Sequence, residues 1–246
     1  MDTMEWLNRT ALLVGEEGVE TLQKKHVLIV GLGGVGAYAA EMLCRAGIGE
    51  LTIVDADVVE KTNLNRQLLA LHTTIGEPKV KVMKRRLLDI NPNLILHLYH
   101  EFLRDDRTLE LLKIAPYDYV VDAIDTLSPK VFLLYHALQC NLKVVSAMGA
   151  GGKLDPALVK VSPIEKTTQC RLAYVLRKRL HHLGVYTGFK AVYSTEKVPQ
   201  SAIRIEDEPN ANKLSNVGTI SYMPALFGLF ATSVVIQDFL AQEIEK

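Results

Sequence analysis

Residues 26–36 read His26-Val27-Leu28-Ile29-Val30-Gly31-Leu32-Gly33-Gly34-Val35-Gly36. An apolar run passes directly into glycines at positions 31, 33 and 36, the spacing of a turn between a buried strand and a helix. Glycine permits a tight turn and lets backbone N–H groups approach a phosphate at the helix N-terminus. The stretch therefore predicts a strand–turn–helix unit that binds a nucleotide, a pattern that many oxidoreductases share.

Strand and helix patterns alternate from this stretch to about residue 150. Apolar, β-branched runs predict strands at residues 27–30, 51–54, 94–99, 117–121 and 142–146. Helical patterns lie between them, at residues 36–46, 78–91, 108–114 and 130–141. This alternation predicts an α/β fold with a doubly wound, mainly parallel, Rossmann-like sheet.

The character of the chain changes beyond Gly149-Ala150-Gly151-Gly152. Short strand signals and a basic helix follow, and an apolar helix is expected from Pro224 to about Ala241. An amphipathic helical segment that ends near Gln23 precedes the first strand. We find no repeats or low-complexity tract. We therefore expect one domain over residues 1–246, with a nucleotide-binding core at 23–150 and an elaborated C-terminal half at 151–246 for substrate binding and dimerisation.

Composition restricts the classes of function. The chain has 246 residues, 48% of them hydrophobic, and a formal net charge of zero. A well-filled core is expected, and binding to nucleic acid would need a local basic patch. The three cysteines, Cys44, Cys140 and Cys170, form no CxxC pair, so a four-cysteine zinc site is excluded. No signal peptide is visible, and we expect a cytoplasmic protein.

One segment is long enough to cross a bilayer. No charged residue occurs from Leu214 to Gln237. The polar residues Ser215, Asn216 and Ser221 and the glycines at 218 and 228 interrupt it. We therefore favour a buried helix at a subunit interface, and no membrane span; a transmembrane helix is the alternative.

The residues after the second strand indicate what the nucleotide is. Asp55 lies 19 residues past Gly36, at a strand end where its carboxylate can accept both ribose hydroxyls. A solvated loop acid is the alternative interpretation. Arg66 and Lys79 follow, with Asn63 and Gln67 as neutral donors. Attack of a carboxylate on an α-phosphate needs such cations around the developing charge, whereas a nicotinamide-dependent oxidoreductase has no use for them.

A magnesium ligand is expected at the next strand end. Asp125 follows the fourth strand, at the edge where such sheets bind ligands, and Mg²⁺ prefers carboxylate oxygen. We therefore expect Arg66, Lys79 and Asp125 to be catalytic, with Asp125 on the metal. The residues expected to bind the nucleotide are Gly31, Gly33, Gly34, Gly36, Asp55, Asp57, Asn63, Arg66, Gln67 and Lys79.

These motifs resemble a known superfamily over about residues 9–150. The glycine-rich turn, Asp55-x-Asp57, Asn63 to Gln67, Gly76-x-x-Lys79 and Asp125 are similar to the adenylation domains of ubiquitin-activating enzymes and bacterial sulfur-carrier adenylyltransferases. The resemblance implies ATP and Mg²⁺, with Asp55 on the ribose, Arg66 and Lys79 on the phosphates, and Asp125 on the metal. It also makes Arg9 a candidate for reaching a partner subunit's nucleotide. Lys130 stands where many members carry Arg, a change that keeps charge but weakens bidentate reach.

The second half resembles a narrower branch, the tRNA threonylcarbamoyladenosine dehydratases. The resemblance rests on Thr10 to Gly15, Asp122 to Asp125, Gly149 to Pro156 and the basic helix from Leu172 to Leu183. It implies adenylation of the threonyl carboxylate of a modified adenosine in tRNA, followed by ring closure that expels AMP. It also implies a homodimer, sulfur-relay proteins as further partners, and a monovalent cation as a further cofactor. No protein thiol is required.

A basic segment supports an RNA substrate independently. Residues 166–195 contain no acid, which is typical of a patch that contacts phosphates. Its cations are Lys166, Arg171, Arg177, Lys178, Arg179 and Lys190, and His181 and His182 add donors. The interleaved Tyr174, Tyr186, Phe189 and Tyr193 could stack a base, although core packing is the more ordinary role. A solvated basic face is the alternative for the whole segment.

Two other functions share the nucleotide site. An adenylyltransferase that activates the C-terminus of a ubiquitin-like sulfur carrier would differ only in its macromolecular partner. Cys170 is the single candidate for an acceptor thiol in the second half, and its basic neighbours would favour the thiolate. However, the sequence around Cys170 equally predicts a helix start with a packed cysteine. A binding module that has lost catalysis is disfavoured because every expected nucleotide-site position is occupied.

Overall fold

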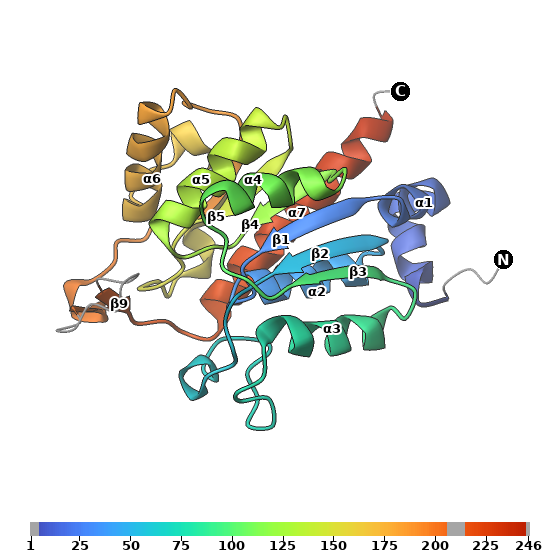
Figure 1. Ribbon diagram of the computed structural model, residues 1–246, viewed down its shortest axis with the longest axis horizontal. Helices are drawn as coiled ribbons and strands as arrows, with labels where there is room; N and C mark the ends of the chain where they lie inside the picture. Colours follow the sequence, from blue (N-terminus) through green and yellow to red (C-terminus); the bar gives the residue numbers. More distant parts are fainter. Residues whose placement is uncertain (1–4, 206–214, 245–246) are drawn as a thin grey trace.

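A seven-stranded sheet organises the molecule (Figure 1). In this computed structural model, which describes residues 5–205 and 215–244, the strand order is β3-β2-β1-β4-β5-β7-β6. Strands β1 to β5 and β7 run parallel, and β6 pairs antiparallel with β7. The order reverses between β1 and β4, which is the topological switch point of a doubly wound sheet. The predicted fold class is confirmed.

The elements follow one another along the chain with few long connections. The strands are β1 His26–Val30, β2 Glu50–Val54, β3 Ile95–Tyr99, β4 Tyr119–Asp122, β5 Val144–Ala147, β6 Val159–Pro163 and β7 Lys190–Ser194, with a separate hairpin of β8 Ile203–Ile205 and β9 Ser215–Val217. The helices are α1 Asn8–Gln23, α2 Gly36–Arg45, α3 Lys79–Ile90, α4 Asp105–Ile114, α5 Leu127–Gln139, α6 Arg171–His182 and α7 Tyr222–Ile244.

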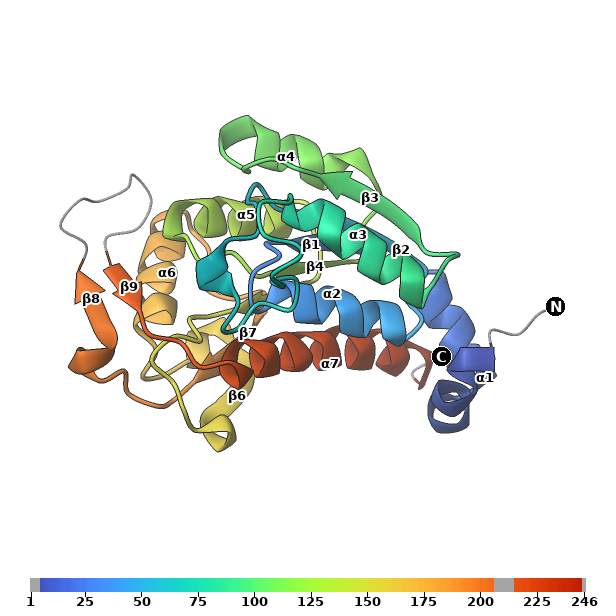
Figure 2. The same cartoon turned by 90° about the horizontal axis from the view of Figure 1, so that it is seen from below.

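Helices cover the sheet on both faces (Figure 2). Helices α2, α3 and α7 pack on one face, and α4, α5 and α6 pack on the other. Alternate residues of a strand point to opposite faces; in β1, Val27 and Ile29 join the first core and Leu28 and Val30 the second. A strand buried on both faces must be apolar throughout, which explains the uninterrupted run that precedes the glycines.

The first five strands and all the helices lie close to their predicted positions, with ends that differ by up to three residues. Strands β6 and β7 were not predicted as members of the main sheet. They extend the sheet beyond residue 150, so the C-terminal half is continuous with the nucleotide-binding half.

Helix α7 is the apolar segment that raised the question of a membrane span. Its stretch Tyr222–Ala241 is long and apolar enough to cross a bilayer by length and composition, and half of it is buried against the rest of the chain. Phe227, Ala231 and Val235 pack in the core beside α2. The helix starts at Tyr222, so Pro224 lies in its first turn rather than at its first position. Leu214 lies outside the described residues.

Candidate active site

The expected nucleotide residues gather at the carboxyl ends of β1, β2 and β4. The glycine-rich loop follows β1, Asp55 follows β2, and Asp125 follows β4. These three strands lie side by side in the sheet, so their following loops meet at one edge. This edge includes the switch point between β1 and β4, where open α/β sheets bind ligands.

Two glycines are required by the backbone of the loop. Gly31 has a φ of 93°, and a Cβ atom there would lie 2.7 Å from the Ala123 carbonyl oxygen. A Cβ atom on Gly36 would lie 1.7 Å from the Gly31 carbonyl oxygen. Side chains at either position would therefore push the loop away from β4 and from the start of α2. The glycines keep the helix N-terminus close to the sheet edge and accessible to a phosphate.

Asp55 fixes the glycine-rich loop through its side chain. Its Oδ2 accepts a hydrogen bond of 2.5 Å from the Leu32 backbone N–H, and its Oδ1 accepts one of 2.7 Å from the Asp57 N–H. Burial raises the pKa of the Asp55 carboxyl, although nearby Lys79 and the two backbone bonds oppose the rise. The carboxylate keeps lone pairs beyond those two bonds, which leaves it able to accept ribose hydroxyls.

Lys79 starts α3 and turns back to the loop after β2. Its Nζ donates to Asp57 Oδ2 at 2.7 Å, and its backbone N–H donates to the Asp57 carbonyl at 3.0 Å. The Lys79 side chain is 5% exposed, whereas that of Asp57 is 69% exposed. The chain therefore holds a buried ammonium group at the sheet edge, beside Asp55.

The segment from Asn63 to Gln67 begins at the last residue of a short 3₁₀ turn, Lys61–Asn63. Asn63 is buried, and its Oδ1 accepts the Glu60 N–H at 3.1 Å, so it stabilises the turn. Arg66 donates to the Thr62 carbonyl at 3.0 Å and to Asn65 Oδ1 at 2.8 Å. These contacts hold the Arg66 guanidinium against residues 62–65. Gln67 lies beside Gly33, which brings its amide to the glycine-rich loop.

Asp125 is exposed just beyond the end of β4. Mg²⁺ binds through one or two carboxylates and keeps several waters and phosphate oxygens as its other ligands. A single exposed carboxylate beside a phosphate-binding loop therefore fits this ion.

Lys130 forms a buried ion pair that was not predicted from the sequence. It is fully buried, and its Nζ lies 2.7 Å from Asp122 Oδ2. It also donates to the carbonyls of Ile124 and Ala147, each at 2.9 Å. Ser146 adds a 2.6 Å hydrogen bond to the same carboxylate oxygen. Lys130 therefore fixes the backbone just before Asp125 from inside the protein.

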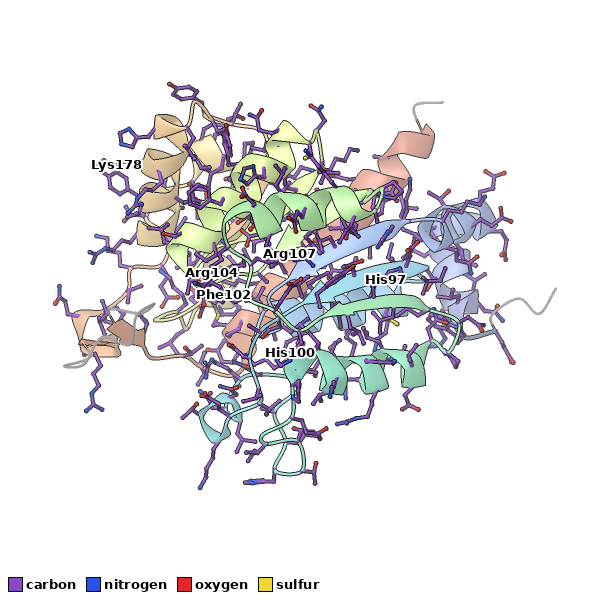
Figure 3. The ribbon with its side chains drawn as sticks, in the orientation of Figure 1. His97, His100, Phe102, Arg104, Arg107 and Lys178 are labelled. Atoms are coloured by element: carbon purple, nitrogen blue, oxygen red, sulfur yellow. The ribbon has the colours of Figure 1, made fainter. Side chains whose placement is uncertain are left out.

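The basic segment divides between two faces of the sheet. On α6, Arg171, Tyr174, Lys178 and Arg179 are exposed, and Lys178 projects away from the body of the molecule (Figure 3). Lys190 lies on β7 and pairs with Asp238 of α7 at 2.5 Å, on the opposite face from α6. Lys190 therefore lies apart from the cations of α6, because alternate β7 side chains point to opposite faces.

Arg177 is also engaged within the chain. Its Nη1 donates to the carbonyls of Ile164 at 3.3 Å and Thr167 at 3.0 Å and to Thr167 Oγ1. These bonds hold the connection between β6 and α6. The exposed basic surface, which we call the α6 surface, consists of Arg171, Lys178, Arg179, His181 and His182, with Lys166 exposed just before the helix.

Lys153 and Glu196, whose contact was not predicted from the sequence, stabilise the Gly149–Pro156 segment. Lys153 is 3% exposed and donates to the Glu196 carbonyl. The Glu196 carboxylate accepts the backbone N–H groups of Leu154 and Asp155, both at 2.9 Å. Burial lowers the pKa of Lys153, although the nearby Cys170 and Glu196 oppose this. Cys170 is half-buried at the start of α6 and packs against the second core.

Comparison with known proteins agrees with this geometry. The model of the ThiF family matches residues 7–244. The chain belongs to the ThiF family. This ThiF-family chain is 37% identical over 239 residues to a tRNA threonylcarbamoyladenosine dehydratase of Bacillus subtilis (strain 168), a match that covers 95% of the chain and 94% of that relative.

A solved structure of the Escherichia coli tRNA N6-threonylcarbamoyladenosine dehydratase in complex with ATP superposes with a TM-score of 0.87 at 33% identity, covering 97% of this chain and 95% of the other. The similarity to this branch of the family is thereby confirmed. The molybdopterin-synthase adenylyltransferase of E. coli (strain K12) is 42% identical, but over 123 residues that make up 49% of each protein.

Proposed function

We propose that this ThiF-family chain is an ATP-dependent tRNA threonylcarbamoyladenosine dehydratase. The observation that carries the proposal is the extent of similarity. The dehydratases of Bacillus subtilis and Escherichia coli match along 95% of the chain, whereas the molybdopterin-synthase adenylyltransferase matches about half of it. Since adenylating enzymes share the nucleotide site, the rest of the chain is what distinguishes their substrates.

The reaction proceeds in two steps. A threonyl carboxylate oxygen attacks the α-phosphorus of ATP, and the bond to pyrophosphate breaks to leave an acyl adenylate. A nucleophile within the same modification then attacks the acyl carbon and loses its proton to solvent, which closes the ring and releases AMP. The oxygen lost in this dehydration leaves with AMP, and no protein thiol takes part. Such a mechanism is compatible with Cys170 as a packed residue.

The protein residues orient ATP and neutralise charge. In this proposal Asp55 binds the ribose, and Gly31, Gly33, Gly34 and Gly36 bring backbone donors to the phosphates. The cations Arg66 and Lys79 stabilise charge that develops on the phosphates in the first step. Asn63 and Gln67 act as neutral donors to the nucleotide, and Asp57 pairs with the Lys79 ammonium group. Mg²⁺ on Asp125 would supply further charge neutralisation at the phosphates.

The α6 surface is proposed to contact the tRNA. Its Arg and Lys side chains are exposed on the outer side of α6, which suits contact with phosphates rather than with ATP. Arg177 and Lys190, which were also expected to bind RNA, contact Thr167 and Asp238 of the same chain. We therefore assign RNA contact first to Arg171, Lys178 and Arg179.

A homodimer is proposed from exposed apolar groups. Leu12 and Leu13, before a break in α1 at Gly15, are 89% and 85% exposed, and Leu229 on the outer side of α7 is 41% exposed. Burial of such side chains against a second copy would remove apolar area from water. Arg9, exposed on the same helix, would then be available to the partner's nucleotide.

Cytoplasmic localisation, a monovalent cation and sulfur-relay partners are further parts of this proposal.

ATP–pyrophosphate exchange tests the proposal. The purified chain is assayed with tRNA that carries threonylcarbamoyladenosine, with the same tRNA lacking the modification, and with a ubiquitin-like sulfur carrier. Exchange, AMP release and ring formation are expected with the modified tRNA alone. Cys170→Ser should retain activity within a few-fold. Exchange with the carrier, or a thioester trapped on Cys170, would support the carrier adenylyltransferase instead.

A further inference from the structure

Three side chains with metal-binding atoms meet beside the first residues of β1 and β2 and the middle of β3. His26, Glu50 and His97 each place one ligand atom within 4.8 Å of the other two. His26 and Glu50 are paired residues of adjacent parallel strands, and His97 is paired with Thr52 on the next strand. All three lie on the same face of the sheet. No part of the proposed adenylation reaction uses them.

The distances between the histidine nitrogens and the Glu50 carboxylate are close to those between ligands of one metal ion. His26 Nδ1 lies 3.4 Å from Glu50 Oε1, and His97 Nε2 lies 2.8 Å from the same oxygen. Tetrahedral zinc with Zn–N and Zn–O bonds of about 2.0–2.2 Å places neighbouring ligand atoms about 3.4 Å apart. The distance from His26 Nδ1 to Glu50 Oε1 already fits this value. The distance from His97 Nε2 to the same oxygen must increase slightly, which His97 allows because its side chain is 46% exposed.

The surroundings of His26 resemble the outer shell of a metal ligand. His26 is buried, and its other ring nitrogen, Nε2, is hydrogen-bonded to Thr52 Oγ1 at 2.8 Å. Metal-binding histidines commonly have such a partner, which fixes the ring and the tautomer. With Nε2–H donating to Thr52, the Nδ1 lone pair faces the Glu50 carboxylate, and a cation between them would stabilise both.

A buried hydroxyl beside the cluster is a second observation at this site. Tyr117 is 5% exposed, and its ring packs edge-on against His26 with centroids 4.7 Å apart. Its hydroxyl lies close to Thr52, yet it makes no hydrogen bond of standard geometry among the described residues. Such buried polar atoms are rare and call for a partner. A water bound to a metal at this site would supply one.

We propose that His26, Glu50 and His97 bind a divalent transition-metal ion of the zinc class, with water in the fourth position. Two imidazoles and one carboxylate suit Zn²⁺ and its neighbours better than Mg²⁺ or Ca²⁺. The ion would link three adjacent strands. His26 is five residues before Gly31, about 16 Å along an extended strand, so the ion would stabilise the fold and take no part in adenylation.

Zinc titration of the full-length chain tests this site directly. The protein carries no polyhistidine tag, is stripped with a chelator, and is titrated with Zn²⁺ by calorimetry without ATP. One ion per chain is expected, together with a melting temperature that rises with zinc concentration. His97→Ala and Glu50→Gln should weaken binding by about 100-fold or more, and Thr52→Val by about 10–100-fold as an outer-shell partner.

Two controls separate this site from other causes of zinc binding. His100→Ala removes an exposed histidine whose Nε2 bonds the Ala56 carbonyl at 2.9 Å, outside the cluster, and should leave affinity unchanged. The Co²⁺-loaded protein should lack thiolate charge-transfer absorption, which excludes the three cysteines.

The partly exposed His97 permits substitution without loss of fold, which circular dichroism of the zinc-free variant checks. Equal zinc affinity in wild type, His97→Ala and Glu50→Gln, or no binding by wild type, would overturn the proposal. Adenylation activity should persist in His97→Ala.

Discussion

Lys79 and Asp57 form an ion pair of 2.7 Å in which the lysine is buried and the aspartate lies in solvent. The lysine begins α3 and the aspartate follows β2, so the pair connects the two segments that border the expected phosphate position. An ammonium group in a partly desolvated position acts more strongly on a developing negative charge than one in water. The fold therefore preorients a buried cation whose counterion is exposed to solvent.

Removal of the Lys79 charge should impair the chemical step. Lys79→Met preserves the aliphatic contacts and deletes the cation, so turnover should fall by about 10²-fold or more, as losses of single transition-state donors do. ATP–pyrophosphate exchange measures the effect. Lys81→Met removes an exposed lysine of the same helix and should leave turnover within about twofold. Near-wild-type exchange by Lys79→Met would show that this lysine is not at the reacting phosphates.

A second prediction concerns the buried pair of Lys130 and Asp122. Lys130→Met leaves the fully buried Asp122 without its cation, which costs about 3–5 kcal/mol when such a pair is broken. Urea denaturation should show this loss, and the double variant Lys130→Met with Asp122→Asn should recover a large part of it. Lys143→Met, at an exposed position, is the matched control. A loss below about 1 kcal/mol for Lys130→Met would contradict a structural role.

The sequence predicts most of the fold because the strands are buried on both faces. An uninterrupted apolar run such as Val27–Val30 has few other structures available, and the following glycines specify the turn. Strands β6 and β7 are harder to recognise. Their exposed or half-buried positions, as at Lys160 and Lys190, break the apolar pattern, and their pairing depends on contacts distant in sequence.

Local sequence patterns predict which residues form the candidate site, but they do not predict which residues those side chains contact. Arg177 and Lys178 are adjacent cations of one helix, yet Arg177 bonds to the chain and Lys178 faces solvent. The internal roles of Lys130 and Lys153 likewise depend on segments that only the tertiary structure brings close. A lysine within the apolar pattern of residues 127–139 was a usable signal, since a buried cation requires a partner.

Stability in acid should depend on Glu41. This buried carboxylate joins Arg45 of α2 and Arg86 of α3. Burial alone would raise the pKa of Glu41, but the two arginines lower it below 4.5. The folded chain therefore binds this proton less readily than the unfolded chain, so stability present above about pH 4.5 is lost as the pH falls further.

Glu41→Gln should reduce stability at pH 7 by about 1–3 kcal/mol, as loss of hydrogen bonds to charged groups does. The difference from wild type should shrink as the pH falls from 4.5 towards 3. Urea denaturation over this pH range measures it. Glu16→Gln, at an exposed position of α1, should follow the wild-type curve. A difference that stays constant with pH would contradict the ion-pair assignment.

The α6 surface should carry affinity for tRNA without affecting ATP. Arg171 and Lys178 are exposed on one helix and outside the nucleotide site, so Arg171→Glu with Lys178→Glu should weaken tRNA binding and leave ATP binding unchanged. Each lost phosphate contact should reduce the slope of log affinity against log salt by about 0.7–0.9. Lys81→Glu with Lys84→Glu makes the same charge change on α3, across the sheet. Filter binding over a salt series compares the pairs. If both double variants weaken tRNA binding equally, net charge rather than the α6 surface accounts for the affinity.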